Sequence, residues 1–225
     1  SLQDGHFSKL KYLKNVFTVN KLIDKYQPEI VHAYYASSYG LLAYLSKAKQ
    51  FHISLWGSDV LQFPFKSFLH RFVFQLIMSK ANKVFSTSEI MIEEASRLFN
   101  RDYVCIPFGV DTDYFFKSNE IFIEDKITLG ITKSLEKIYG IDILINAVSL
   151  LHKKDINVFL KIAGRGSEDK TLKELVSKLN LGDYIEFSEH LDHYDLNKFY
   201  NSVDIACFPS RSESFGVSVL EANSC

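Results

Sequence analysis

The sequence predicts an α/β protein built from two doubly wound, Rossmann-like domains that face a cleft. Of the 225 residues, 47% are apolar, which is enough for one large core or two small ones. Short apolar runs alternate with segments of helical periodicity, which is typical of parallel sheets covered by helices. This alternation stops at the turn-rich residues 107–113 and then restarts, so the break favours two domains.

The first half of the chain supports a domain over residues 1–112. Residues 8–26 place apolar side chains on one helical face. Strands are expected at 29–33, 51–55, 83–86 and 102–106, and further helices at 37–47, 65–79 and 89–99.

The second half repeats the pattern, so a second domain is expected over residues 113–225, with a linker near 110–125. Strands are expected at 126–131, 157–163, 184–187 and 203–208, and helices at 141–151, 169–179, 195–201 and 216–221. Ligand sites favour the interface between such domains.

The last nineteen residues combine the features of an anion site. Residues 203–208 predict a short buried strand, Pro209 ends it, and a polar loop leads to a helix. Ser214 is a suitable N-cap, which would leave the N–H groups of Phe215, Gly216 and Val217 free to bind phosphate. Gly216 would let a ligand approach the backbone.

Glu213 and Glu221 flank this predicted phosphate site. Carboxylates there accept hydrogen bonds from sugar hydroxyls, although a loop acid and a surface helix acid explain the same pattern. The pattern Pro-Ser-x-x-Glu-x-Phe-Gly-x-x-x-Leu-Glu-Ala, residues 209–222, resembles the donor-site signature of family 4 retaining glycosyltransferases, which have the GT-B fold.

Other stretches carry the same resemblance in family order. They are Pro28-Glu-Ile-Val-His32, Trp56-Gly-Ser-Asp59, residues 106–115, Lys133-Ser-Leu-Glu-Lys-Ile-Tyr-Gly-Ile-Asp142 and Ala163-Gly-Arg-Gly-Ser-Glu168. The family begins with a strand and a glycine-rich loop that would precede Ser1, and its donor domain continues past Cys225. We therefore expect both domains to be incomplete in this chain, and the chain alone to lack turnover.

The resemblance assigns roles on the donor side. Glu213 would orient donor-sugar hydroxyls and Glu221 the ribose, while Lys133 and Lys137 would neutralise the leaving diphosphate. Lys133 stands where the family has Arg, and an extra residue before Gly140 shifts the alignment of Lys137. Two solvated loop lysines are the alternative.

Further donor contacts are expected after two other strands. Gly164 lies in Gly164-Arg-Gly166, which is also an ordinary strand-ending turn. Leu191 ends the stretch that matches the nucleobase contact of the family.

On the acceptor side, the resemblance points to Trp56, Gly57, Asp59 and His32. Trp56 replaces a His of the family, which removes acid–base chemistry there and suggests stacking on a sugar face. Asp59 is also explained as an N-cap, and His32, at a strand end, as a buried structural histidine.

Composition limits the partners. The net charge of −1 gives no global attraction to nucleic acid or to a membrane. No run has transmembrane length, and the three cysteines lack metal-site spacing, so a cytoplasmic protein with reduced thiols is expected. Residues 63–72 mix aromatics with Lys66, His70 and Arg71, which fits a core-facing helix or a peripheral membrane contact on the inner face.

The resemblance implies a metal-independent retaining glycosyltransferase, since no Asp-x-Asp metal motif is evident. The donor would be a UDP-, GDP- or ADP-sugar, no other cofactor is expected, and the acceptor would be a glycan or a lipid-linked sugar in polysaccharide synthesis. Two alternatives stay open, a nucleotide-sugar-binding module without turnover and a GT-B-type nucleotide-sugar epimerase.

Overall fold

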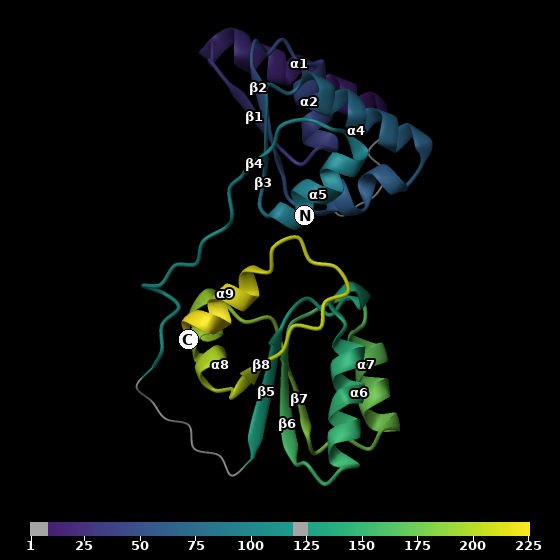
Figure 1. Cartoon of the computed structure of the whole chain (residues 1–225), viewed down its shortest axis with the longest axis vertical. Coiled ribbons are helices and arrows are strands. Elements are labelled where there is room, and N and C mark those ends of the chain that lie inside the picture. Colours follow the sequence, from purple (N-terminus) through teal and green to yellow (C-terminus); the bar gives the residue numbers. More distant parts are fainter. Residues whose placement is uncertain (1–8, 119–125) are drawn as a thin grey trace. The chain divides into compact units, whose positions relative to one another are not determined.

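The computed structural model describes residues 9–118 and 126–225, and it forms two compact units, Ser1–Phe108 and Gly109–Cys225. Figure 1 shows a parallel sheet with associated helices in each unit. The unit boundary falls four residues before the predicted one at 112/113. Ser8, the predicted start of the first helix, and the last part of the predicted linker lie outside the described residues.

The sheet of the first unit has four parallel strands in the order β1-β2-β3-β4. They are β1 (Val31–Tyr34), β2 (Phe51–Leu55), β3 (Lys83–Ser86) and β4 (Val104–Cys105). Alternate residues of these strands, such as Ala33, Ile53 and Val84, face the core of the unit. Their neighbours along each strand are more exposed, as the two-residue period of a strand requires.

The helices of the first unit are α1 (Lys9–Tyr26), α2 (Ser38–Leu45), α3 (Ser58–Leu61), α4 (Phe68–Lys80) and α5 (Glu89–Leu98), with a 3-10 turn η1 (Phe63–Phe65). The predicted helix over residues 65–79 begins later, at Phe68. The reason is local: Ser67 has extended backbone angles and its hydroxyl accepts a hydrogen bond from the His70 N–H, so Ser67 is the N-cap.

The sheet of the second unit is also parallel, in the order β7-β6-β5-β8. Its strands are β5 (Ile127–Thr132), β6 (Val158–Ala163), β7 (Ile185–Ser188) and β8 (Ile205–Ala206). Successive strands extend from β5 to β7 in one direction, whereas β8 pairs on the other side of β5. The strand order therefore reverses beside β5, and ligands of open α/β sheets bind outside the carboxyl ends of the strands at such a point.

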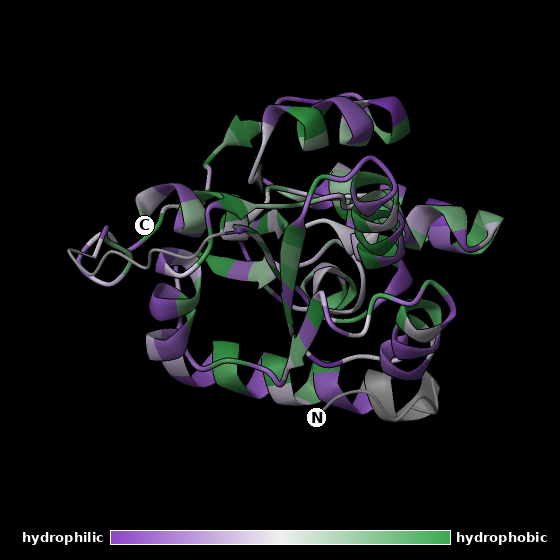
Figure 2. Ribbon diagram, turned by 90° about the horizontal axis from the view of Figure 1, so that it is seen from below, coloured by the Kyte–Doolittle hydropathy of each residue, from purple (hydrophilic) through white to green (hydrophobic). Residues whose placement is uncertain are grey.

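Helices cover both faces of this second sheet (Figure 1). They are α6 (Ile141–His152) and α7 (Asp169–Lys178) on one face, and α8 (His193–Asn201) and α9 (Val217–Ser224) on the other. A 3-10 turn, η2 (Lys137–Tyr139), precedes α6. In Figure 2 the helices carry both hydrophobic and hydrophilic residues along their length, as expected when one side of each helix packs on a sheet.

The strand predicted over residues 203–208 is shorter and less buried than expected. Only Ile205 and Ala206 pair with β5, and Ile205 is 51% exposed. The Cys207 N–H still donates to the Gly130 carbonyl oxygen at 2.8 Å, after which the chain leaves the sheet. The apolar run is therefore a two-residue strand that places the following loop beside the end of β5.

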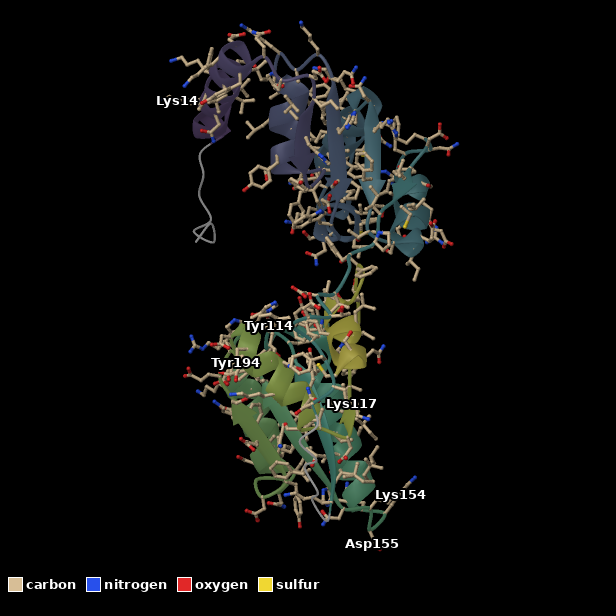
Figure 3. The ribbon with its side chains drawn as sticks, turned by 90° about the vertical axis from the view of Figure 1, so that its left-hand side faces the viewer. Lys14, Tyr114, Lys117, Lys154, Asp155 and Tyr194 are labelled. Atoms are coloured by element: carbon tan, nitrogen blue, oxygen red, sulfur yellow. The ribbon has the colours of Figure 1, made fainter. Side chains whose placement is uncertain are left out.

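The segment after residue 108 packs on the second unit before the undescribed residues begin. Phe115 is 2% exposed in a cluster with Ala163, Phe199 and Tyr200. The Tyr114 ring packs against the His193 ring, with centroids 4.6 Å apart and the ring planes tilted by 35°, and in Figure 3 Tyr114 is labelled close to Tyr194 of α8. The first part of the predicted linker is therefore attached to the second unit.

Among residues 9–118 and 126–225, no helix is both long enough and apolar enough to cross a membrane.

Candidate functional site

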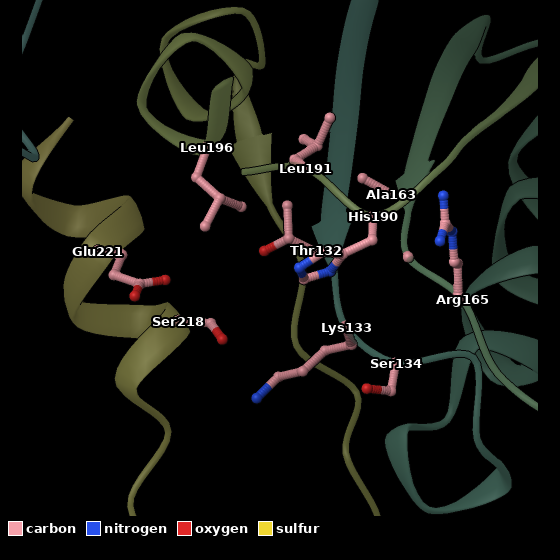
Figure 4. Close-up of a pocket in the computed structure, with 11 residues that line it drawn as sticks. Thr132, Lys133, Ser134, Ala163, Arg165, His190, Leu191, Leu196, Ser218 and Glu221 are labelled. Carbon is pink, nitrogen blue, oxygen red and sulfur yellow. The ribbon is translucent and has the colours of Figure 1, made fainter. Parts of the chain in front are cut away.

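A pocket of about 390 Å³ opens at the carboxyl ends of β5, β6 and β7, where the strand order of the second sheet reverses. Figure 4 shows α9 on one side of it and the strand ends on the other. Its lining consists of Thr132, Lys133, Ser134, Ala163, Gly164, Arg165, His190, Leu191, Leu196, Ser218 and Glu221. Four predicted donor-side residues, Lys133, Gly164, Leu191 and Glu221, are thus brought together although up to 88 positions separate them.

Lys133 forms an ion pair with Glu213, the loop acid predicted to orient the donor sugar. The Lys133 Nζ lies 2.9 Å from the Glu213 Oε2, which also accepts a hydrogen bond from the Ser210 hydroxyl at 3.3 Å. The side chain of Lys133 is only 11% exposed, and its Nζ lies 5.1 Å from the centroid of the Tyr139 ring. The lysine is therefore held in one place before any ligand arrives.

The loop that carries Lys133 is fixed by the loop after β6. The Lys133 N–H donates to the Ala163 carbonyl oxygen at 3.2 Å, and the Leu135 N–H donates to the Arg165 carbonyl oxygen at 2.9 Å. Gly164 has a φ of 154°, and a Cβ there would lie 2.0 Å from the Lys133 carbonyl oxygen. Gly164 is thus required for the close packing of two loops, and this packing aims Lys133 at the pocket.

Glu221 is held by a buried tyrosine. The Tyr200 hydroxyl donates to the Glu221 Oε2 at 3.4 Å and also forms a hydrogen bond with the Thr132 hydroxyl. Tyr200 is 4% exposed, and burial raises the pKa of its phenol, so it stays a neutral donor. In Figure 4 the Glu221 carboxylate and the Ser218 hydroxyl point from α9 toward the side of the pocket formed by Thr132 and Lys133.

The predicted cap of the last helix is wrong. Gly216, not Ser214, is the N-cap, with φ 82° and ψ 53°, and the helix begins at Val217. The left-handed angles of Gly216 interrupt the helical backbone, so the Phe215 N–H is not at the helix N-terminus. The pocket lining does not include the predicted phosphate-binding residues Ser214, Phe215, Gly216 and Val217. The residues of α9 that line the pocket are Ser218 and Glu221.

The loop that carries Glu213 is clamped to the start of α6 by Arg211. Its two terminal nitrogens lie 2.9 and 2.7 Å from the two oxygens of Asp142, and one of them donates to the Lys137 carbonyl oxygen at 2.6 Å. The Arg211 guanidinium lowers the pKa of the Asp142 carboxyl. Lys137 itself is exposed in η2 and lies outside the lining of the pocket.

In the first unit, the predicted acceptor residue Trp56 belongs to an aromatic cluster. Its ring contacts Tyr34, Tyr35 and Phe108, with centroids 5.2, 5.5 and 5.6 Å away. Trp56 itself is 37% exposed. Tyr34 is the last residue of β1 and Tyr35 follows it directly. Both tyrosines were missed, although two consecutive aromatic residues at the end of a strand are visible in the sequence.

Asp59 is a structural residue of the two loops beside Trp56. It is 1% exposed, and its oxygens accept hydrogen bonds from the Ala36 N–H at 2.7 Å, the Gly57 N–H at 2.9 Å and the Trp56 N–H at 3.1 Å. Burial raises the pKa of this carboxyl, while these bonds oppose the rise. Asp59 therefore joins the ends of β1 and β2 and cannot itself reach a ligand.

The sequence predicts His32 at the end of a strand, but the structure places it inside its strand. It is the second residue of β1, where its Nε2 lies 2.8 Å from the Ser54 hydroxyl oxygen and its ring stacks on Tyr34 at 4.9 Å. Burial and the nearby His52 lower the pKa of His32. The histidine thus supports Tyr34, which in turn contacts Trp56.

Comparison with known families agrees with this geometry. The model for "Glycosyl transferases group 1" matches residues 113–225, and the model for "Glycosyl transferase 4-like" matches residues 1–88. The chain belongs to the group 1 glycosyltransferase family. The junction between the two matches also falls near the boundary between the two units at residues 108/109.

Curated relatives include a glycosyltransferase of Methanocaldococcus jannaschii that is 26% identical over 97% of this chain and 60% of its own length. An O-antigen biosynthesis glycosyltransferase of Escherichia coli is 34% identical over 44% of this chain and 26% of its own length. The chain thus spans about three fifths of the length of the first of these two relatives.

Solved structures confirm the GT-B fold. Sucrose-phosphate synthase of Thermosynechococcus elongatus has a TM-score of 0.79 at 21% identity, covering 94% of this chain and 57% of its own. The Anabaena protein HepE in complex with UDP and glucose has a TM-score of 0.78 at 17% identity, covering 98% of this chain and 63% of its own.

Several residues of this group 1 pocket were not predicted. Thr132 and Ser134 flank Lys133, while Ser218 precedes Glu221 by three positions and therefore shares its helix face. Arg165 lines the pocket and forms an ion pair with Glu189. Only the helical spacing of Ser218 and Glu221 gave a usable signal in the sequence.

Proposed function

We propose that the protein is a retaining, metal-independent glycosyltransferase that transfers a sugar from a nucleotide-diphosphate sugar to a glycan or lipid-linked acceptor. The observation that supports this most directly is that a cation, Lys133, and a carboxylate, Glu221, line one pocket at the point where the strand order reverses. In a nucleotide-diphosphate sugar, the phosphates would bind Lys133 and the hydroxyls would bind Glu221. Family membership supports the reaction type.

The proposed chemistry depends on the leaving group. Breaking the bond between the anomeric carbon and the phosphate oxygen places positive charge on the sugar ring and negative charge on the β-phosphate. Lys133 is held nearly buried at this place, where a fixed charge acts more strongly than in water. The N-terminus of α9, where Ser218 lines the pocket, would add partial positive charge from the other side.

These groups supply the charge that a metal ion would otherwise supply. Among the described residues, no three His, Cys, Asp or Glu side chains gather to hold a metal. The acceptor would attack the same face of the sugar that the phosphate leaves, and a phosphate oxygen would take its proton. This route needs no protein nucleophile with a paired base.

Glu213 would act through two contacts. It holds Lys133 at 2.9 Å in the structure, and its remaining oxygen would accept hydrogen bonds from donor-sugar hydroxyls. When a diphosphate approaches, Lys133 would share its three N–H groups between Glu213 and the phosphate. Glu213 therefore both positions the Lys133 cation and balances its charge.

Glu221 would bind the ribose hydroxyls, with the Tyr200 hydroxyl fixing one of its oxygens. The adjacent Leu191 and Gly164 would bound the nucleobase side of the pocket. UDP-, GDP- and ADP-sugars are all proposed donors. Because HepE was solved with UDP and glucose, a uridine nucleotide is the first to test.

In the first unit, Trp56 would stack on a sugar face of the acceptor. Its exposed ring is backed by Tyr34 and Tyr35, which fix its orientation. Rigid aromatic rings bind sugars with little loss of conformational freedom. Gly57, Asp59 and His32 would support Trp56 through the loop and strand contacts described above.

Titration calorimetry with UDP, GDP and ADP tests the donor site. Glu221→Ala should weaken the binding of the preferred nucleotide by ~1.5–3 kcal/mol, since a hydrogen bond to a charged group is lost. Glu174→Ala, on the exposed face of α7, is the matched control and should bind normally. Equal affinities of the three proteins would contradict the ribose assignment.

Release of nucleotide from the sugar donor separates transfer from the alternatives. Release that depends on an added acceptor supports glycosyl transfer. Binding without release would show a nucleotide-sugar-binding module, and a changed sugar still attached to nucleotide would show an epimerase.

A further inference from the structure

The first unit exposes a compact apolar surface at the start of α4, which we call the α4-tip surface. Its members are Phe65, Lys66, Phe68, Leu69, Arg71 and Phe72. Phe68 is 86% exposed, Phe65 65%, Leu69 60% and Phe72 48%. Single exposed apolar residues are ordinary, but four within eight positions form a patch of the kind that marks an interaction site.

The surface is held rigidly by the residues beneath it. Pro64 is buried, and the Ser67 hydroxyl lies 2.7 Å from the His70 Nδ1 while it caps the helix. The opposite side of α4 is anchored by Phe74, Ile77 and Met78, which are all 0% exposed. The exposed phenyl rings thus belong to an ordered helix start whose other face is in the core.

The segment that carries the α4-tip surface has charges of one sign. From residue 60 to residue 88 the sequence contains no Asp or Glu, although the chain has 27 acidic residues. Lys66 and Arg71 lie within the surface and are exposed. By contrast Ile90, which is 70% exposed on α5, lies next to Glu89 and near Glu93. Apolar exposure and local positive charge therefore coincide at the α4-tip surface.

We propose that the α4-tip surface docks on a lipid bilayer that contains anionic lipids. Phenyl and leucyl side chains would enter the boundary between headgroups and acyl chains, and Lys66 and Arg71 would contact lipid phosphates. A twofold contact between two copies fits less well, because it would place the two cations of each surface near those of the other.

This surface also fits the acceptor side of the first unit. The loop of Trp56 leads through α3 and η1 directly to Phe65, a distance of nine residues in the chain. Docking of this segment on a membrane would suit an acceptor that is carried by a membrane lipid. The docking proposal itself does not require nucleotide binding, so the two proposals can fail separately.

Flotation with vesicles tests the proposal. The protein should float with vesicles of phosphatidylcholine and phosphatidylglycerol, and much less with phosphatidylcholine alone. Phe68→Ser with Leu69→Ser should reduce the partition coefficient roughly tenfold or more, because two large apolar side chains no longer enter the bilayer. Lys66→Gln with Arg71→Gln should reduce it roughly 25-fold, from about fivefold for each cation.

Ile90→Ser removes an equally exposed apolar residue from an acidic setting on the same unit, and it should float like the parent protein. Circular dichroism should show all variants folded, as their changed side chains are exposed. Failure of the parent protein to bind anionic vesicles would overturn the proposal. So would a concentration-dependent dimer in sedimentation that Phe68→Ser with Leu69→Ser abolishes, because the surface would then bind a second copy.

Discussion

At the scale of single residues, the buried carboxylate of Asp59 makes a prediction about stability. Asp59→Ala removes the partner of three backbone N–H groups that join the ends of β1 and β2. The free energy of unfolding should fall by about 3 kcal/mol, from about 1 kcal/mol for each bond. Urea unfolding followed by the fluorescence of Trp56, the single tryptophan, measures this in the first unit.

Asp24→Ala is the control for that experiment. Asp24 forms an exposed ion pair with Lys47 at 3.2 Å, and such pairs contribute about 0–1 kcal/mol. If Asp59→Ala were no more destabilising than Asp24→Ala, the two loops would be held together by other contacts.

Lys133 and Lys137 give a second prediction at this scale. Lys133 lines the pocket whereas Lys137 does not, so the two lysines should differ in their effect on phosphate binding. Lys133→Met should weaken the binding of a nucleoside diphosphate by ~1.5–3 kcal/mol, and that of the nucleoside itself much less. Lys137→Met should change both little. If calorimetry showed the larger loss of affinity for Lys137→Met, the phosphate contact would be assigned to Lys137 instead.

At the scale of elements, the Arg211–Asp142 clamp predicts a pH dependence. Arg211 lowers the pKa of Asp142 in the folded state below its ordinary value of 3.8. The stabilisation that this ion pair gives is therefore present above pH 3.8. It is lost as the pH falls through the lower pKa that Asp142 has in the folded state. Arg211→Gln should be less stable than the parent near neutral pH, and the two should converge in acid.

Unfolding experiments over a pH series measure that difference. The control is Arg97→Gln, which breaks an exposed ion pair with Glu94. The difference in stability between this variant and the parent should change much less with pH. A constant gap between Arg211→Gln and the parent down to acid pH would show that the carboxylate of Asp142 is not what Arg211 stabilises.

The elements also show how far local sequence determines this fold. β2 and β3 lie at their predicted residues, because hydrophobic runs bounded by turn residues are local signals. The cap at Gly216 was missed because Ser214 is also a suitable cap, and only the left-handed backbone decides between them. The ion pair of Lys133 with Glu213 joins residues 80 apart, so no local pattern could reveal it.

At the scale of the whole molecule, the first prediction concerns metal ions. The proposed reaction uses Lys133 and the N-terminus of α9 against the leaving phosphate, so EDTA should leave sugar transfer by the protein largely unchanged. The measurement is acceptor-dependent nucleotide release with and without chelator. Complete inactivation by EDTA that Mn²⁺ reverses would contradict the metal-independent mechanism.

The central claim is that the pocket of the second unit binds the nucleotide diphosphate of the donor. Titrating the isotopically labelled protein with UDP, and then with GDP and ADP, and following backbone amide shifts by NMR tests it most directly. Saturable changes should concentrate at residues 132–135, 163–166, 190–191 and 217–221, with β1–β4 unaffected. Changes confined to the first unit, or none with any nucleotide, would contradict the claim.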